Sequence, residues 1–453
     1  MTFPTYPDYK TSGFDWLPEV PAHWADRKIS RDIPFVVGWT PPSGKDEYYD
    51  GELPWVTIAD MTQMSVEDTK SKISLLAVRD KGAKIVPAGS MLFSFKLSVG
   101  KVAFLTIDSY TNEAIAGFLP SGPLDLDYWR YAAPEFIPRY GRENIYGATL
   151  LNQELISSVR FFAPARAEQT QIARFLDHET ARIDGLIEEQ QRLIELLKEK
   201  RQAVISHAVT KGLDPTVPMK YSGVEWLGDV PAHWVVSQLK LNTLEMQTGP
   251  FGSQLHAEDY VDGGIPLVNP AHMIDGEIIP DPQVSVDEVT WQRLKRHALT
   301  AGDIIFARRG ELGRCAIVTN EQEGWLCGTG SLKARLNAQL DAEYAYLLIT
   351  SKGAVAELSL ESKGSTMENL NTETLGRIRL PLPPVSEQKA ILEYVHEVSG
   401  QFGALVDEAE SGISLITERR SALISAAVTG KIDVRGWQPP ASVPTPELAQ
   451  EAV

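Results

Sequence analysis

Three arginines in the second half of the chain have the side-chain type and setting needed to read the edge of a nucleic-acid base. Arg308 and Arg309 directly precede one glycine, and Arg314 directly follows another. A guanidinium donates paired hydrogen bonds to the O6 and N7 atoms of guanine in the major groove. The neighbouring glycines leave the backbone free to approach a ligand closely. The opposing interpretation is a surface loop in which these arginines pair with Glu311 or another carboxylate.

Further polar loops could contact a nucleic acid. In the first half of the chain, Lys96, Ser98 and Lys101 take the place of the arginine loop. A turn with Lys363 and Ser365 has the composition of a phosphate-contacting turn. Its equivalent in the first half is a basic and aromatic loop with the residues Arg139, Tyr140, Arg142, Asn144 and Tyr146. For each of these loops, a merely solvated surface is the alternative.

Catalytic motifs do not accompany these loops. The sequence has no [DN]PP[YF] tetrad for amino-methyl transfer and no Walker loop for nucleotide binding. Clustered metal ligands and a Ser/His/Asp signature are also absent from the sequence, and Cys315 and Cys327 lack the spacing of a metal site. We therefore expect a non-enzymatic chain without a cofactor or metal of its own, in a reducing cytoplasm.

Two long helices must position the loops. Within residues 166–211, apolar residues recur at three-, four- and seven-residue steps, which is typical of a helix with one apolar stripe. A helix of this kind, ~66 Å long at ~1.5 Å per residue, needs a partner to cover its stripe. Residues 159–214 align without a gap on residues 378–433, which lie 219 positions later. The chain is therefore a duplication whose second long helix pairs with the first, and the topology favours an antiparallel pair.

A second repeat precedes each half. Residues 10–24 return as residues 220–234, with ten of fifteen positions identical. Paired tryptophans such as Trp24 and Trp234 indicate a buried structural clasp, and His23 and His233 fit hydrogen-bonded turn residues better than metal ligands. The first clasp begins the chain, although its equivalent position follows the second helix. Antiparallel helices would therefore bring the two chain ends together.

The repeats divide the chain into an α+β protein with pseudo-two-fold symmetry. The expected segments are a clasp (1–24), a first module (25–165), a long helix (166–211), a linker with the second clasp (212–234), a second module (235–384), a second long helix (385–431) and a disordered proline-rich tail (432–453). The formal net charge is -17, and none of these segments is net positive. Any nucleic-acid contact must therefore come from local clusters of cationic residues.

These features together resemble the specificity subunit of type I restriction-modification systems. The resemblance rests on the helix openings AEQTQIARFLD and SEQKAILEYV, the helix endings ISHAVTKGLD and ISAAVTGKID, and the doubled VPAHW. The stretch TGPFGSQL, residues 248–255, also resembles a common opening of target-recognition domains. The first module lacks this pattern at residues 38–51, so its contacts cannot be carried over from the family.

The resemblance implies a non-catalytic DNA reader with two α/β target-recognition domains joined by an antiparallel coiled coil. Each domain would recognise one half of a bipartite target, and Ser253 and Gln254 would join the second domain's DNA contacts. The helices would set the spacing and dock two methyltransferase subunits, which motor-nuclease subunits then join. AdoMet, ATP and Mg would be bound only by these partners.

A contact with a partner is expected early in each long helix. Phe175 and Leu176 in the first helix, and Tyr394 and Val395 in the second, follow a Glu-Gln pair and are expected to be exposed. The alternative is that they pack on their own module.

A different class of function remains open. The chain could be a coiled-coil scaffold whose modules bind protein or sugar rather than DNA. The sequence shows neither a signal peptide nor an apolar run of membrane-spanning length.

Overall fold

The computed structural model describes residues 3–96, 98–143, 149–310, 312–362 and 370–440. The chain divides into two compact units, of which unit 1 comprises residues 1–190 and 411–453 and unit 2 comprises residues 191–410. Each unit therefore contains one module and one half of each long helix.

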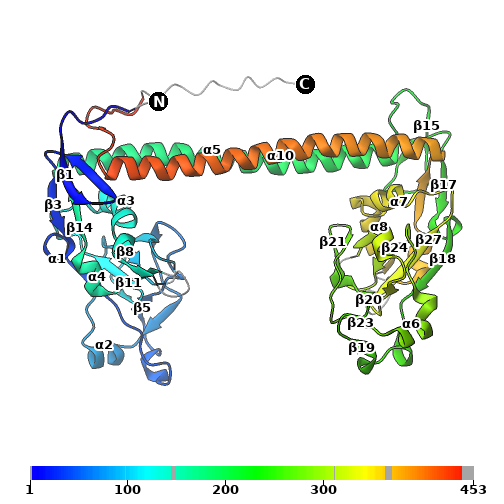
Figure 1. The fold of residues 1–453 in the computed structure, drawn as a ribbon, viewed down its shortest axis with the longest axis horizontal. Helices are drawn as coiled ribbons and strands as arrows, with labels where there is room; N and C mark the ends of the chain where they lie inside the picture. The colour runs from blue at the N-terminus through cyan, green and yellow to red at the C-terminus, as the bar shows by residue number, and fades with distance from the viewer. Residues whose placement is uncertain (1–2, 97, 144–148, 311, 363–369, 441–453) are drawn as a thin grey trace. The chain divides into compact units, whose positions relative to one another are not determined.

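Unit 1 holds an α+β module with two main sheets (Figure 1). The larger sheet has the strand order β4 (Phe35–Val37), β11 (Ile115–Phe118), β8 (Met91–Ser94), β9 (Val102–Leu105) and β6 (Ser65–Val66). The smaller sheet has the order β10 (Tyr110–Thr111), β5 (Leu53–Val56) and β7 (Ser71–Ile73). Two-stranded pairs are β1 (Tyr9–Phe14) with β2 (Leu17–Pro21), β3 (Ala25–Lys28) with β14 (Arg160–Ala163), and β12 (Arg142–Glu143) with β13 (Thr149–Leu150). The short helices are α1 (Ile29–Asp32), α2 (Leu75–Lys81), α3 (Leu126–Phe136) and α4 (Gln153–Ser158).

Unit 2 also holds an α+β module with two main sheets, each of four strands. One sheet has the order β18 (Thr243–Thr248), β27 (Ser331–Leu336), β24 (Ile304–Ala307) and β25 (Cys315–Ile317). The other has the order β19 (Tyr260–Val261), β23 (Ser285–Val286), β20 (Ile265–Val268) and β26 (Leu326–Cys327). Two-stranded pairs are β15 (Met219–Tyr221) with β16 (Asp229–Pro231), β17 (Val235–Gln238) with β28 (Arg379–Leu382), and β21 (Met273–Ile274) with β22 (Glu277–Ile278). The helices are α6 (Glu288–Leu294), α7 (Ala342–Ile349), α8 (Lys352–Ser362) and α9 (Thr372–Arg377).

Aromatic side chains fill the main core of unit 1. Phe118 lies edge-on to Trp129 with ring centroids 5.8 Å apart, and Trp129 packs on Phe161 at 4.7 Å. All three side chains are fully buried. They join the sheet, helix α3 and strand β14, so the module is tied to the strand that leads into the first long helix.

The repeated Leu-Asn pair has a local structural role in both units. Asn152 accepts a hydrogen bond from the Leu155 amide at 2.8 Å, and Asn371 accepts one from the Thr374 amide at 2.8 Å. Each asparagine is thus the N-cap of a short helix, α4 or α9. That helix turns the chain back into β14 or β28.

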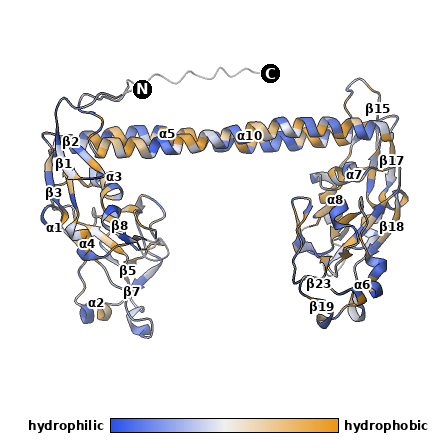
Figure 2. Cartoon of the chain, in the orientation of Figure 1, coloured by the Kyte–Doolittle hydropathy of each residue, from blue (hydrophilic) through white to orange (hydrophobic). Residues whose placement is uncertain are grey.

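The long helices are α5 (Arg166–Lys211) and α10 (Val385–Val428). In unit 1, Asp184 of α5 accepts a hydrogen bond from Arg420 of α10 at 2.8 Å. In unit 2, residues near the end of α5, such as Val209, share a core with Ile391 near the start of α10. Each unit therefore contains an antiparallel pair, as predicted. Both helices carry hydrophilic and hydrophobic residues along their length (Figure 2). Leu186 and Leu193 belong to the predicted apolar stripe, yet their side chains are 43% and 44% exposed.

The clasps pack against the start of a long helix in both units. Trp24 donates to Glu168 at 3.1 Å, and Trp234 donates to Glu387 at 3.0 Å. His23 and His233 contact the same carboxylates, at 2.9 and 2.8 Å. The histidines are therefore hydrogen-bonded, as expected from the sequence.

The adjacent glutamines fasten each module to its helix. The Gln169 side chain accepts from the Asp125 amide at 2.8 Å, and Gln388 accepts from the Asp341 amide at 2.8 Å. The repeated Glu-Gln pair thus holds the clasp on one side and the module on the other.

The chain ends meet within unit 1. The Asp433 amide donates to the Pro4 carbonyl at 2.7 Å, and the Tyr9 hydroxyl donates to the Gly430 carbonyl at 3.1 Å. The expectation of a disordered tail from residue 432 is wrong for its first residues. Val434 is buried, and Trp437 packs edge-on to Phe175 at 5.4 Å, because these apolar side chains cover the end of the helix pair. Residues 441–453 lie outside the described part of the chain.

Candidate nucleic-acid interface

In unit 2, three loops leave the same edge of one sheet. Strand β18 ends, β27 begins and β24 ends at this edge, because Thr248 pairs with Leu332 and Ala307 pairs with Ser331. The loops are residues 249–254, 328–330 and 308–314, and we call this edge the reading edge of unit 2. Two predicted sets of contact residues, at 253–254 and at 308–314, therefore lie on one edge.

Glycine is required where these loops cross. A Cβ atom on Gly249 would lie 1.8 Å from the Gly328 carbonyl oxygen, and one on Gly328 would lie 2.2 Å from the Asn269 side-chain oxygen. The Asn269 oxygen also accepts from the Gly330 amide at 3.4 Å. The backbones are thus packed directly on each other, which fixes the base of the reading edge.

Arg308 and Arg309 carry positive charge at this edge. The Arg308 Nε donates to the Leu370 carbonyl at 3.2 Å, and the Leu370 amide donates back to Arg308 at 2.8 Å. Burial, and next the charge of Arg309, lower the pKa of Arg308, but a guanidinium stays protonated. Arg309 is exposed. Within the described ranges no carboxylate pairs with either arginine. The alternative of an ion pair with Glu311 falls on a residue that lies outside those ranges.

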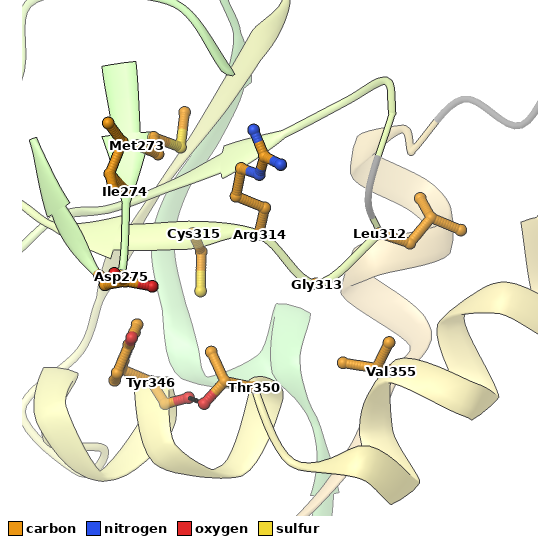
Figure 3. Close-up of a pocket in the computed structure, with 11 residues that line it drawn as sticks. Met273, Ile274, Asp275, Leu312, Gly313, Arg314, Cys315, Tyr346, Thr350 and Val355 are labelled. Carbon is orange, nitrogen blue, oxygen red and sulfur yellow. Dashed lines mark hydrogen bonds between the residues drawn. The ribbon is translucent and has the colours of Figure 1, made fainter. Parts of the chain in front are cut away.

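Arg314 is exposed at the end of the same loop, beside a cavity of about 370 Å³. Figure 3 shows that Arg314 points away from Tyr346 and Thr350, whereas Cys315 points toward them. Burial raises the pKa of the Cys315 thiol to about 12, so the thiol stays protonated and is a poor nucleophile. The cavity therefore offers no reactive group from this cysteine.

The loop at residues 249–254 presents side chains to solvent. Phe251 is 58% exposed and Ser253 is exposed, whereas the Gln254 side-chain oxygen is buried without a hydrogen-bond partner in the described chain. The base of this loop is held by His297, whose Nδ1 lies 3.0 Å from the Thr248 carbonyl oxygen. Ser253 and Gln254 remain predicted DNA contacts.

The reading edge of unit 1 is formed by the equivalent strands. Here β4 ends, β11 begins and β8 ends, and a Cβ atom on Gly38 would lie 1.7 Å from the Thr111 carbonyl oxygen. Lys96 is exposed and Lys101 half-buried, and both adjoin the end of β8. Phe95 is buried in the place of Arg308. At the other two positions unit 1 has a lysine where unit 2 has an arginine: Lys96 for Arg309 and Lys101 for Arg314.

A glutamate also lies on the reading edge of unit 1, and the sequence did not point to it. Glu113 is exposed between β10 and β11 and accepts a hydrogen bond from the Thr40 hydroxyl. This bond holds the pKa of the Glu113 carboxyl below its usual value, and Lys96 adds to the effect. Only the strand register brings these residues together, since no spacing rule links them.

Other predicted contacts have different surroundings. The Arg139 guanidinium pairs with Glu135 and lies over the Trp16 ring at 4.1 Å, so it also holds the clasp. Arg142 is exposed in strand β12. Asn144, Tyr146, Lys363 and Ser365 lie outside the described residues.

The expected exposure of the partner-contact residues is wrong for three of the four. Phe175 and Leu176 are fully buried and Val395 is 3% exposed, because they pack in the cores of their own units. Phe175 is covered by Phe3, at a centroid distance of 5.1 Å, as well as by Trp437. Tyr394 is 38% exposed and lines a cavity of about 580 Å³.

Comparison with protein families decides what this doubled architecture is. The family model for the type I restriction modification DNA specificity domain matches residues 31–197 and again residues 244–405. The chain belongs to the family of type I restriction-modification specificity subunits. As a specificity subunit, it is the DNA-recognition component of such a system.

Two relatives, which cover different shares of the chain, agree with this family. The MjaIX specificity subunit of Methanocaldococcus jannaschii is 23% identical over 425 residues, which cover 92% of this chain and 95% of that protein. The EcoKI specificity subunit of Escherichia coli is 23% identical over 61% of this chain and 58% of that protein.

Two solved structures share the fold. The HsdS subunit of Thermoanaerobacter tengcongensis matches with a TM-score of 0.51, at 13% identity, over 91% of this chain and 98% of that chain. A chain from a type I R-M system matches at 0.58, with 14% identity, over 91% of this chain and 99% of that chain.

The described part of this specificity subunit has no group of three or more His, Cys, Asp or Glu that could hold a metal ion. Among the same residues, no helix is both long and apolar enough to cross a membrane.

Proposed function

We propose that each module reads one half of a bipartite duplex target through its reading edge. The supporting observation is that both edges present cationic side chains on a chain with a net charge of -17. Within the described ranges, no carboxylate pairs with Arg308 or Arg309. The other predicted contacts of the second module are Arg314, Ser253, Gln254, Lys363 and Ser365. Those of the first module are Lys96, Lys101, Arg139, Arg142, Asn144 and Tyr146.

The long helices are proposed to set the spacing between the half-sites and to dock two methyltransferase subunits. Restriction and motor subunits would join that core, and AdoMet, ATP and Mg would be bound by these partners. The chain itself would do no chemistry, in keeping with the lack of catalytic motifs in its sequence.

Salt-dependent binding tests the proposed function. Proteins that neutralise phosphates release counterions, so log K for duplex DNA should fall linearly with log salt, with a slope of about -0.9 per phosphate. The double variant R308A/R309A should lower this slope or abolish preference among duplexes. The control is Arg377→Ala, an exposed arginine that pairs with Glu373 in α9. A wild-type chain that binds duplexes without any salt slope would favour the scaffold function instead.

Tyr394 is the surviving candidate for a methyltransferase contact. It is exposed beside an apolar cavity whose lining includes Val204, Leu213 and Met219. The equivalent Phe175 of unit 1 is already covered by Phe3 and Trp437. Tyr394→Ser should therefore weaken the complex with the methyltransferase on gel filtration, whereas Tyr221→Ser, at a position 69% exposed in unit 2, should not. An undiminished complex with Tyr394→Ser would rule out docking there.

A further inference from the structure

Glu113 is an unexpected residue to find on the reading edge of unit 1. A carboxylate near DNA is repelled by the phosphates, so an exposed glutamate there opposes binding unless it accepts hydrogen bonds from a base. The equivalent position in unit 2, between β26 and β27, is Thr329, which has no charge. The glutamate therefore distinguishes the two modules.

The strand register determines where Glu113 lies. The Phe95 amide donates to the Ala114 carbonyl at 2.9 Å, which places Lys96 beside the turn that carries Glu113. On the other side, the Gly38 amide donates to the Ile115 carbonyl at 3.4 Å, which places Thr40 beside the same turn. Glu113 is thus flanked by one hydroxyl donor and one ammonium group.

The carboxylate is held in place before any ligand arrives. Thr40 donates its hydroxyl hydrogen to one carboxylate oxygen, Oε2. The preceding Trp39 is fixed by its amide, which donates to the Thr111 carbonyl at 2.9 Å, and by the Trp55 indole, which donates to its carbonyl at 3.1 Å. An ionised carboxylate has about four acceptor sites, so Glu113 keeps free lone pairs on a side chain whose orientation is set.

We infer that Glu113 and Lys96 together read a C·G base pair in the half-site of unit 1, with Thr40 as the positioning residue. Glu113 accepts a hydrogen bond from the exocyclic amino group of cytosine, and Lys96 donates to O6 or N7 of the paired guanine. Thymine and guanine present only acceptors at their major-groove hydrogen-bonding positions, so the carboxylate repels them. This inference rests on the proposed function of the reading edges.

Adenine also has an exocyclic amino group, so the test must separate the two bases. Duplexes bound by the full chain, co-purified with the subunits it assembles with, are selected from a random pool and sequenced. The wild type should enrich a C·G pair in one half-site, and Glu113→Ala should lose that enrichment while keeping the other half-site. An enriched A·T pair that is lost in the same way would contradict the assignment to cytosine.

The amino group is then tested directly. Replacement of the enriched cytosine by 2-pyrimidinone removes the amino group and should weaken wild-type binding by on the order of 10-fold to 100-fold. Glu113→Ala should bind both duplexes equally. The matched control is Glu67→Ala, an exposed glutamate that follows β6 at the opposite edge of the same sheet, and it should behave like the wild type.

The role of Thr40 has its own readout. Thr40→Val keeps the side-chain shape but removes the donor, so the preference for cytosine over 2-pyrimidinone should narrow without any change in the salt slope. Tighter binding of Glu113→Ala to every duplex, with the cytosine preference intact, would overturn the inference, because the carboxylate would then only repel phosphates. A wild-type chain that enriches no sequence and shows no salt slope would overturn the proposed function itself.

Discussion

The two modules share their supports and differ in the side chains that those supports carry. Gly38 and Gly249 each lie directly against a backbone carbonyl oxygen, and Asn152 and Asn371 cap equivalent helices. In both units, the first residue after strand β5 or β20 donates its amide to the side chain three residues further on. This acceptor is Asp60 in unit 1 and His272 in unit 2.

The exposed positions on the reading edges do not match. Lys96 stands where unit 2 has Arg309, and Glu113 stands where unit 2 has Thr329. The comparison teaches that equivalent strand ends can carry different side chains on this fold, since the differing residues make few of the contacts that hold the sheet.

The largest expected effect comes from the shared glycines. Gly249→Ala or Gly38→Ala would force a Cβ atom to within 2 Å of a carbonyl oxygen, at 1.8 and 1.7 Å respectively. We expect each to destabilise its own module by roughly 4 kcal/mol, because backbone must shift on backbone. Hydrogen exchange, resolved by module, measures the loss. The control Gly252→Ala has open space around its Cβ and a φ of +59°, so it should lose only about 1 kcal/mol. Equal losses at Gly249 and Gly252 would contradict the close packing.

A difference in pH dependence should separate the units. Burial, and next the charge of Arg296, lower the pKa of His297 to about 4, well below the value of an unfolded histidine. As the pH falls, the unfolded chain therefore takes up the proton before the folded chain does. The stabilisation is fully present above pH ~6.5 and is lost as the pH falls towards ~4, a decrease of about 3 kcal/mol in the free energy of unfolding. In unit 1 the equivalent residue is Lys84, two positions before Val86 as His297 is two positions before Leu299, so unit 1 has no imidazole at this place.

The measurement is the unfolding free energy of each module between pH 4 and 7. His297→Gln should remove this part of the dependence from unit 2 and leave unit 1 unchanged. If His297→Gln and wild type lose the same stability over this interval, the histidine is not the source.

The arginine and lysine positions allow the comparison to be tested by exchange. Arg309→Ala should weaken binding by about 2 kcal/mol, the loss of one bidentate base contact, and should relax preference only in the half-site of unit 2. Arg309→Lys, which copies unit 1, should recover part of the affinity, because an ammonium lacks the planar fork. Lys96→Ala serves as the control for the other half-site. The measurement is the affinity of each variant for duplexes in which one half-site at a time is altered. If a variant changed the preference in both half-sites equally, the two modules would not read separate half-sites.

The smallest expected effect concerns the clasps. Glu168 accepts from Tyr6 and Trp24 and contacts His23, whereas Glu387 has only Trp234 and His233 as partners in the described chain. Glu168→Gln should therefore destabilise unit 1 by about 2 kcal/mol, and Glu387→Gln should destabilise unit 2 by about 1 kcal/mol. Thermal unfolding of the two variants compares them, and a larger loss for Glu387→Gln would show that Tyr6 adds nothing.

Part of the interface could be predicted because it lies in short stretches. The cluster of Arg308, Arg309 and Arg314 is visible in the sequence, since all three belong to one loop. Exposure could not be predicted in the same way. Phe175 fits an exposed helix position by its local spacing, but Phe3 and Trp437, from opposite ends of the chain, cover it. The tail is a similar case. Its proline content predicts disorder, but Val434 and Trp437 make apolar contacts with distant residues that the sequence does not reveal.

By itself, the sequence determined the duplication, the antiparallel helix pairs, the α+β modules and the meeting of the chain ends. These features follow from periodicity, which is a local pattern, and from repeats that recur at a fixed offset along the chain. Only the tertiary structure decided which side chains share an edge. Thr40 and Glu113 are separated by 73 positions, and they meet because strand β11 pairs with β4 on one side and β8 on the other. Register is a property of paired strands, and a single strand does not carry it.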